Sequence, residues 1–118
     1  MPQTSSAVSA SAPPTTLCLT TEATAPLAEA LAAALVERGL AACVALTPLR
    51  SVYRWRGELQ RSEEVQLLIK THPSRLGELE AAVRQLHSYT TPEWLHWPAD
   101  AAADYGAWVA ECCSPAAS

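Results

Sequence analysis

The stretch from His87 to Trp94, HSYTTPEW, gathers the side chains of this chain that are best suited to chemistry. An imidazole nitrogen and a carboxylate oxygen are both ligands of divalent metals, and imidazole suits copper and zinc. His87 and Glu93 are six residues apart, so they do not share one helix face as an i, i+4 pair does. Pro92 stiffens the turn between them. Such a turn either brings the two side chains together at a metal or separates them.

A purely structural interpretation of the same residues is favoured on the sequence alone. His87 would end a helix, where a positive charge interacts well with the helix dipole. Tyr89 would pack, and Glu93 would bond to the backbone or to a basic group such as Lys70. The other histidines form no ligand cluster with their neighbours: His72 is expected to cap a helix or to be exposed, and His96 to lie at a solvated edge.

The four cysteines are Cys18, Cys43, Cys112 and Cys113, and their spacing matches neither a zinc ribbon nor a C-x-x-C motif. Reduced thiols are expected, with Cys43 buried and inert inside an apolar run. For the adjacent pair Cys112 and Cys113, three interpretations stay open: a soft Cu(I) site, a strained disulfide, or incidental thiols.

Nothing in the chain indicates catalysis. It contains no G-x-S-x-G, no glycine-rich phosphate loop and only four glycines. No histidine stands beside a plausible nucleophile in the sequence, so the protein is not expected to be an enzyme.

Apolar spacing and turn signals predict the elements that must position these residues. Residues 15–20 indicate a strand. A helix is expected over 24–38, because Thr24 can cap it and Gly39 can end it. Its predicted buried stripe is Leu27, Leu31, Ala34 and Leu35.

The middle of the chain indicates strands. Residues 40–46 form a nearly continuous apolar run, which Pro48 is expected to interrupt. Extended structure resumes over 51–57, and residues 64–71 alternate in polarity. A second helix opens at Pro73, a short strand covers 92–98, and a final helix covers 104–113. The second helix has the predicted stripe Leu76, Leu79, Val83 and Leu86.

The resulting order, β-α-β-β-α-β-α, predicts an α+β, ferredoxin-like βαββαβ sandwich with an added C-terminal helix. Right-handed crossovers place both long helices on one face of the sheet. A trimer that packs sheet against sheet would cover the other face. Trp55 and Trp108 are expected in the core or at a subunit interface.

Five segments in this order resemble the CutA divalent-cation tolerance family: LVERGLAACV, SVYRWRGELQ, EVQLLIKT, HSYTTPE and DYGAWV. The resemblance runs from about Leu17 to Trp108. It implies a homotrimer similar to the nucleotide-sensing PII proteins and a link to copper. It also places His87 and Glu93, which with Cys18 are the candidate metal ligands, in a cleft between subunits near Tyr53, Trp55, Lys70 and Tyr89. The chain departs from the family in three places: the usual His-Pro-Tyr is His87-Ser88-Tyr89, the loop around Pro48 lacks the usual glycine and is one residue short, and the first strand leads into TTEATAP.

Composition limits the remaining possibilities. Apolar residues make up 49% and charged residues 17% of the 118 residues, which suits one packed domain. This domain is expected over 15–113, between a disordered leader at 1–14 and a mobile tail at 114–118. A net charge of −4 without a basic stripe argues against nucleic acid as a partner. No apolar run approaches the roughly 20 residues that span a bilayer, so no membrane partner and a cytoplasmic location are expected.

Three possibilities follow as hypotheses, of which the third is a structural scaffold that binds metal only adventitiously. The first is a non-catalytic protein of metal tolerance that binds divalent copper, Cu(II), through His87 and Glu93. The second is a PII-like trimeric signalling module, in which Lys70 binds an anionic metabolite or nucleotide and Tyr53 and Trp55 stack on it.

Overall fold

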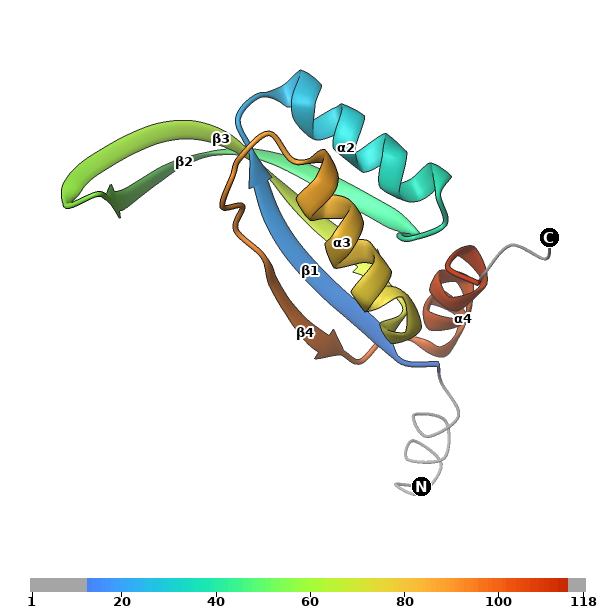
Figure 1. Cartoon of the computed structure of the whole chain (residues 1–118). Coiled ribbons are helices and arrows are strands. Elements are labelled where there is room, and N and C mark those ends of the chain that lie inside the picture. Colours follow the sequence, from blue (N-terminus) through green and yellow to red (C-terminus); the bar gives the residue numbers. More distant parts are fainter. Residues whose placement is uncertain (1–12, 115–118) are drawn as a thin grey trace, which may run out of the picture.

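An antiparallel four-stranded sheet, in the order β2-β3-β1-β4, organises the chain (Figure 1). The computed structural model describes residues 13–114. The elements in chain order are β1 (Thr15–Glu22), α2 (Ala25–Glu37), β2 (Cys43–Trp55), β3 (Glu58–Thr71), the short 3-10 helix η1 (Pro73–Arg75), α3 (Leu76–Leu86), β4 (Leu95–Ala99) and α4 (Ala103–Cys112). The predicted β-α-β-β-α-β-α order and the ferredoxin-like fold are therefore confirmed. The proposed leader and tail lie almost entirely outside the described residues.

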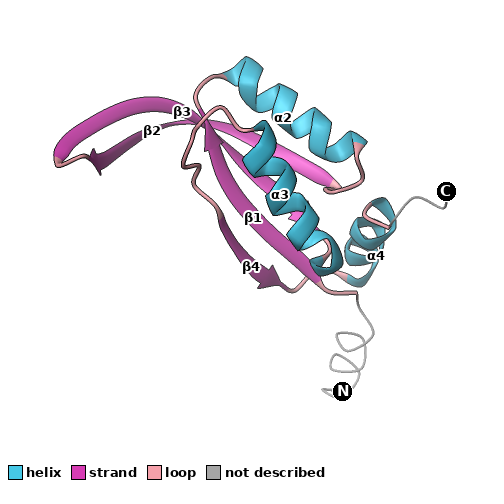
Figure 2. Cartoon of the chain, viewed as in Figure 1, coloured by secondary structure: helices cyan, strands magenta, loops and turns pink. Residues whose placement is uncertain are grey.

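Helices α2 and α3 lie side by side on one face of the sheet, as predicted (Figure 2). The central strand β3 faces them with alternate residues Val65, Leu67 and Ile69, which are at most 8% exposed. Leu35 of α2 and Leu79 of α3 are fully buried against this strand. The core is thus one layer of aliphatic side chains between two helices and a sheet.

Local signals set the ends of α2. The Thr24 hydroxyl accepts a hydrogen bond from the Leu27 amide at 3.3 Å, which satisfies one of the free amides of the first turn. Gly39 follows the helix with φ of +70°, a left-handed conformation that glycine adopts without a steric penalty. Both predicted boundaries are confirmed.

Two predicted positions of the buried stripes are wrong. Leu27 is 42% exposed and Leu86 is 38% exposed. Each lies at the end of its helix, Leu27 in the first turn of α2 and Leu86 as the last residue of α3. Helical periodicity gives the direction of a side chain but not where the sheet beneath it stops.

The predicted interruption at Pro48 is also wrong. β2 runs without a break through Pro48, which lies opposite Val65 of β3. β2 is an edge strand, so a residue without an N–H group can be accommodated on its outer side. The fourth strand begins later than predicted, at Leu95, and includes Pro98 at the other edge of the sheet.

The far half of the β2–β3 hairpin projects beyond the helices (Figure 1). Arg56 and Gly57 form its two-residue turn with φ of 52° and 82°, the positive values of a type I′ turn. Large apolar side chains on this arm are more than 40% exposed: Val52, Tyr53, Trp55 and Leu59. Trp55 therefore does not belong to the core of the subunit, and neither does Trp108 on α4, which is 42% exposed.

The face of the sheet opposite α2 and α3 is apolar. Leu17, Leu19 and Leu68 alternate with buried positions on β1 and β3, and all three are partly accessible. On the edge strand β4, Leu95 is 52% and Trp97 39% exposed. Among residues 13–114, no helix is long and apolar enough to cross a membrane.

Candidate functional site

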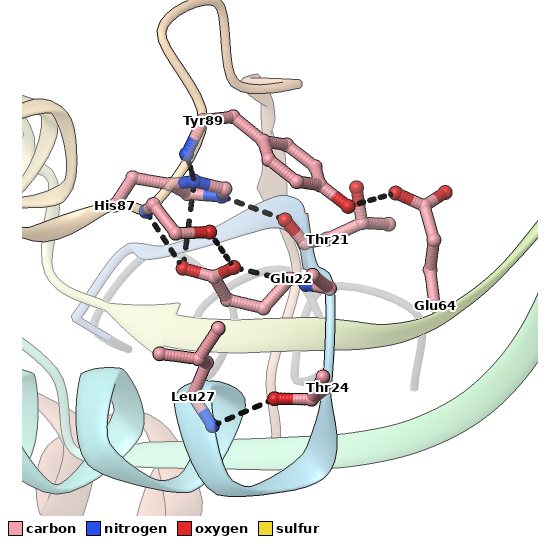
Figure 3. Close-up of polar contacts among 9 residues, drawn as sticks. Thr21, Glu22, Thr24, Leu27, Glu64, His87 and Tyr89 are labelled. Carbon is pink, nitrogen blue, oxygen red and sulfur yellow. Dashed lines mark hydrogen bonds and ion pairs between the residues drawn. The ribbon is translucent and has the colours of Figure 1, made fainter.

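The loop after α3 is fixed to the end of β1 by a buried carboxylate, Glu22, which is 1% exposed (Figure 3). The Ser88 amide donates to Glu22 Oε2 at 3.0 Å and the Ser88 hydroxyl to Oε1 at 2.5 Å. The Ala23 amide also donates to Oε1, at 2.9 Å. Three donors thus surround one carboxylate, and they hold two segments together that lie 66 residues apart in the chain.

The same contacts set the ionisation of Glu22. Burial by itself raises the pKa of this carboxyl, because it removes water from the charged form. The hydrogen bonds from the Ser88 hydroxyl, the Ser88 amide and the Ala23 amide act in the opposite direction, with a smaller contribution from His87. They outweigh burial, so the pKa of Glu22 is lowered and the group is a carboxylate at neutral pH.

His87 is buried beside Glu22, and both of its ring nitrogens are engaged (Figure 3). Nε2–H donates to the Thr21 carbonyl at 2.6 Å, and Nδ1 accepts from the Tyr89 amide at 3.0 Å. These two partners assign the neutral tautomer with its proton on Nε2. Nδ1 lies 3.5 Å from Glu22 Oε2. His87 therefore fixes the start of the loop to β1.

Tyr89 connects the loop to the sheet. Its hydroxyl donates to Glu64 Oε2 on β3 at 2.8 Å (Figure 3). Burial raises the pKa of Tyr89, and the hydrogen bond to the Glu64 carboxylate and the nearby negative charges raise it further. The phenol thus stays a donor at neutral pH, and it leaves the other oxygen of Glu64 available for a further partner.

A groove of ≈ 840 Å³ opens where this loop meets the projecting hairpin. Glu64 directly precedes the buried Val65 on β3, so its side chain points to the sheet face opposite the helices. The Glu93 side chain, on an exposed residue, completes the acidic part of the groove. The twelve lining residues include no lysine, arginine or histidine: Thr21, Ser51, Val52, Tyr53, Trp55, Ser62, Glu64, Ser88, Tyr89, Thr90, Thr91 and Glu93.

The structure brings only some of the predicted site residues together. Tyr53, Trp55, Tyr89 and Glu93 all line the groove, whereas His87 is buried behind it. Lys70 does not line the groove. It pairs with Cys43 on β2, and its ammonium lies 3.8 Å from the Cys43 sulfur.

The position of Lys70 follows from strand geometry. It is six residues beyond Glu64 on β3, which corresponds to about 20 Å along an extended strand. Glu93, the predicted partner of Lys70, lines the groove, which Lys70 does not reach.

Cys18 is fully buried in the core under the helices. Burial and the nearby Glu80 carboxylate raise the pKa of its thiol to about 12. A thiol must lose its proton to ligate a metal. Ligation by Cys18 therefore stays a prediction, and the burial of the thiol does not favour it.

The remaining cysteines are free thiols. The predicted burial of Cys43 is wrong, because this side chain is only partly covered. Cys113 is buried beside Thr71, with Sγ and Oγ1 3.7 Å apart, and burial raises the pKa of the Cys112 thiol. The described cysteines thus form no disulfide, which removes that interpretation of the adjacent pair.

Within residues 13–114, no three histidine, cysteine, aspartate or glutamate side chains are grouped as a metal site requires. The two other histidines behave as predicted. His72 Nδ1 accepts from the Ser74 amide at 3.1 Å at the start of η1, and His96 is exposed on the edge strand β4.

Sequence reasoning missed Glu22, Ser88 and Glu64. For Glu22 and Ser88 the signals were two departures from the family pattern, the TTEATAP sequence after the first strand and Ser88 in place of proline. Each looks like an isolated exception in the sequence, and the structure shows that they are partners, because proline offers neither donor that Ser88 gives to Glu22.

Fold and groove together define a small ferredoxin-like protein with a groove between a projecting hairpin and the loop after α3. Residues 16–112 match the family model described as CutA1 divalent ion tolerance protein, and the chain belongs to this family. The predicted resemblance is therefore confirmed.

Individual relatives agree with the family match. The chain is 42% identical over 87 residues to the divalent-cation tolerance protein CutA of Thermus thermophilus, covering 72% of this chain and 84% of that protein. It is 44% identical over 84 residues to the CutA of Pectobacterium atrosepticum, covering 70% and 76%.

Solved structures agree as well. CutA from Synechococcus elongatus superposes with a TM-score of 0.83 at 38% identity, covering 86% of this chain and 91% of that chain. A protein from Archaeoglobus fulgidus, described as a periplasmic divalent cation tolerance protein, superposes with a TM-score of 0.82 at 29% identity, covering 85% and 99%.

Proposed function

We propose that this protein acts in tolerance to divalent cations by binding the cation without catalysis, with Cu(II) as the first candidate. Its relatives carry the name divalent-cation tolerance protein. The observation that supports cation binding is the charge of the groove, which has two carboxylates, Glu64 and Glu93, and no basic side chain among its lining residues. Such a groove attracts cations and repels anions.

Glu64 and Glu93 are the cation ligands that we assign within the subunit. Direct ligation by His87 remains a prediction, and it requires His87 to give up its bond to the Thr21 carbonyl or to the Tyr89 amide. Further ligands would come from solvent or from a second subunit, since the described residues contain no complete ligand group.

The absence of catalysis is part of the proposal. The Ser88 hydroxyl donates to the Glu22 carboxylate, and the neighbouring His87 uses both nitrogens in bonds to the backbone. Neither arrangement is the pair of nucleophile and base on which covalent catalysis depends.

We also propose a homotrimer in the cytoplasm. The support for self-association is the apolar sheet face opposite the helices, with Leu95 and Trp97 exposed on β4. Light scattering should give three times the mass of the chain, and a monomer at micromolar concentration would contradict the proposal. The cytoplasm suits the free thiols.

The alternative, a signalling module that binds an anionic metabolite or nucleotide, has less support. Lys70, the residue expected to bind the anion, does not line the groove. In a calorimetric titration, ATP should give no heat of binding to the protein. Binding of ATP at micromolar concentration would favour the alternative instead.

Calorimetric titration with Cu(II), Zn(II) and Ni(II) tests the proposed function. A variant with Cys43→Ala and Cys112→Ser should serve as the parent, because accessible thiols bind copper themselves. Glu93→Gln should weaken Cu(II) binding by about tenfold or more, as expected when one charged ligand is lost.

Two further variants locate the ligands. Glu58→Gln, on an exposed residue that does not line the groove, is the matched control and should bind as the parent does. His87→Gln tests whether His87 itself ligates the metal or whether Glu64 and Glu93 bind it without His87. The substitution retains a hydrogen-bond donor but removes the imidazole. Unchanged Cu(II) affinity in Glu93→Gln would refute the assignment of the groove.

A further inference from the structure

The groove is larger than a metal ion needs. Its volume of ≈ 840 Å³ falls within the roughly 300–1,000 Å³ typical of sites for small organic molecules. Two carboxylates occupy only part of its wall, and the rest consists of aromatic, apolar and hydroxyl side chains.

Three aromatic rings line this groove: Tyr53 and Trp55 from β2 and Tyr89 from the loop. Trp55 is 51% and Tyr53 41% exposed, so both have surface that an apolar ligand can cover.

The two carboxylates of the groove are hydrogen-bond acceptors for a charged donor. One oxygen of Glu64 accepts from the Tyr89 hydroxyl, which fixes the orientation of the carboxylate. Glu93 lies on an exposed residue of the same groove. A primary ammonium group offers three donors and no acceptor, so it matches carboxylates and cannot leave an acceptor of its own unsatisfied.

We infer that the groove binds a primary organic ammonium, with the charged nitrogen at Glu64 and Glu93 and an apolar body against Tyr53 and Trp55. The inference deepens the proposed function and rests on it in one respect, the cation-attracting charge of the groove. It differs in ligand class, because an organic ammonium uses the aromatic wall and a metal ion does not.

Phenethylamine is a suitable probe, and 2-phenylethanol is its neutral analogue. Calorimetry on the intact oligomer should show binding of the amine and at least about tenfold weaker binding of the alcohol, which lacks the charge. Trp55→Leu should weaken amine binding about tenfold and leave Cu(II) binding unchanged. Trp108→Leu is the matched control, because Trp108 is similarly exposed at 42% but lies on α4 outside the groove.

The outcomes separate the two proposals. No binding of the amine, or equal binding of amine and alcohol, overturns the inference; if Cu(II) still binds through Glu93, the proposed function stands. Amine binding that Trp55→Leu and Glu93→Gln weaken supports the inference, even where Cu(II) shows no affinity and the metal proposal fails. Weakening by Trp108→Leu to the same extent as by Trp55→Leu would also overturn it, since binding would then not depend on the groove.

Discussion

Ser88→Ala tests whether the buried carboxylate of Glu22 holds the groove loop in place. The substitution removes the hydroxyl that donates to Glu22 Oε1 and leaves the Ser88 amide bond to Oε2 intact. Hydrogen bonds to charged groups contribute about 1.5–3 kcal/mol each. Glu22 is 1% exposed, so water does not readily replace the lost donor. We therefore expect Ser88→Ala to lower the free energy of unfolding by about 2 kcal/mol at neutral pH.

The effect should depend on pH in a defined direction. The pKa of Glu22 is lowered in the folded protein from its ordinary value of 4.5. A lowered pKa means that the carboxylate stabilises the fold above the unfolded-state value and that this contribution is lost as the pH falls through the folded-state value. The difference between Ser88→Ala and the parent should accordingly be full above about pH 5 and should shrink at more acidic pH.

Urea unfolding followed by circular dichroism measures this difference. Protein concentration must be the same for each variant, because self-association contributes to apparent stability. Ser51→Ala is the matched control, since among the described residues the Ser51 hydroxyl makes no hydrogen bond and the residue also lines the groove. A loss below about 0.5 kcal/mol in Ser88→Ala, or a loss that stays constant into the acid range, would refute the role assigned to Glu22.

Three further predictions concern the loop, the thiols and the core. Tyr89→Phe should remove a stabilising contribution that is complete below about pH 10 and is lost at more alkaline pH, because the pKa of Tyr89 is raised in the folded protein. If the free energies of unfolding of the variant and the parent keep a constant difference above this pH, the prediction is contradicted. Cys18 and Cys113 are at most 1% exposed and should resist alkylation until the protein unfolds, as mass spectrometry of iodoacetamide-treated native protein can show. Leu79→Ala, at a fully buried position, should cost about 2–5 kcal/mol in urea unfolding, whereas Leu27→Ala, at 42% exposure, should cost much less; equal losses would mean that the core boundary is misplaced.

Local signals in the sequence were sufficient for most of the fold. Thr24 and Gly39 bound α2 because caps depend only on neighbouring backbone groups. The alternation of Val65, Leu67 and Ile69 identifies the buried face of β3, because successive residues of a strand point to opposite sides. The prediction at Pro48 is wrong because the effect of a proline depends on whether its strand is an edge strand, which is a property of the whole sheet.

The candidate site was only partly predictable. HSYTTPEW identifies the loop, and Tyr89 and Glu93 do line the groove. The sequence does not show that His87 is turned inward toward Thr21, because that contact joins residues 66 positions apart.

By itself, the sequence determined the order of the elements and the helix limits, since both follow from short-range periodicity and caps. It also gives directly the residue types that are available for binding. The tertiary structure alone decided which of those residues meet. Pairing between β1, β3 and the loop after α3 brings Glu22 to Ser88 and Glu64 to Tyr89, and the length of β3 takes Lys70 away from the groove. Charge and burial at a site depend on such long-range neighbours, and local patterns carry no information about them.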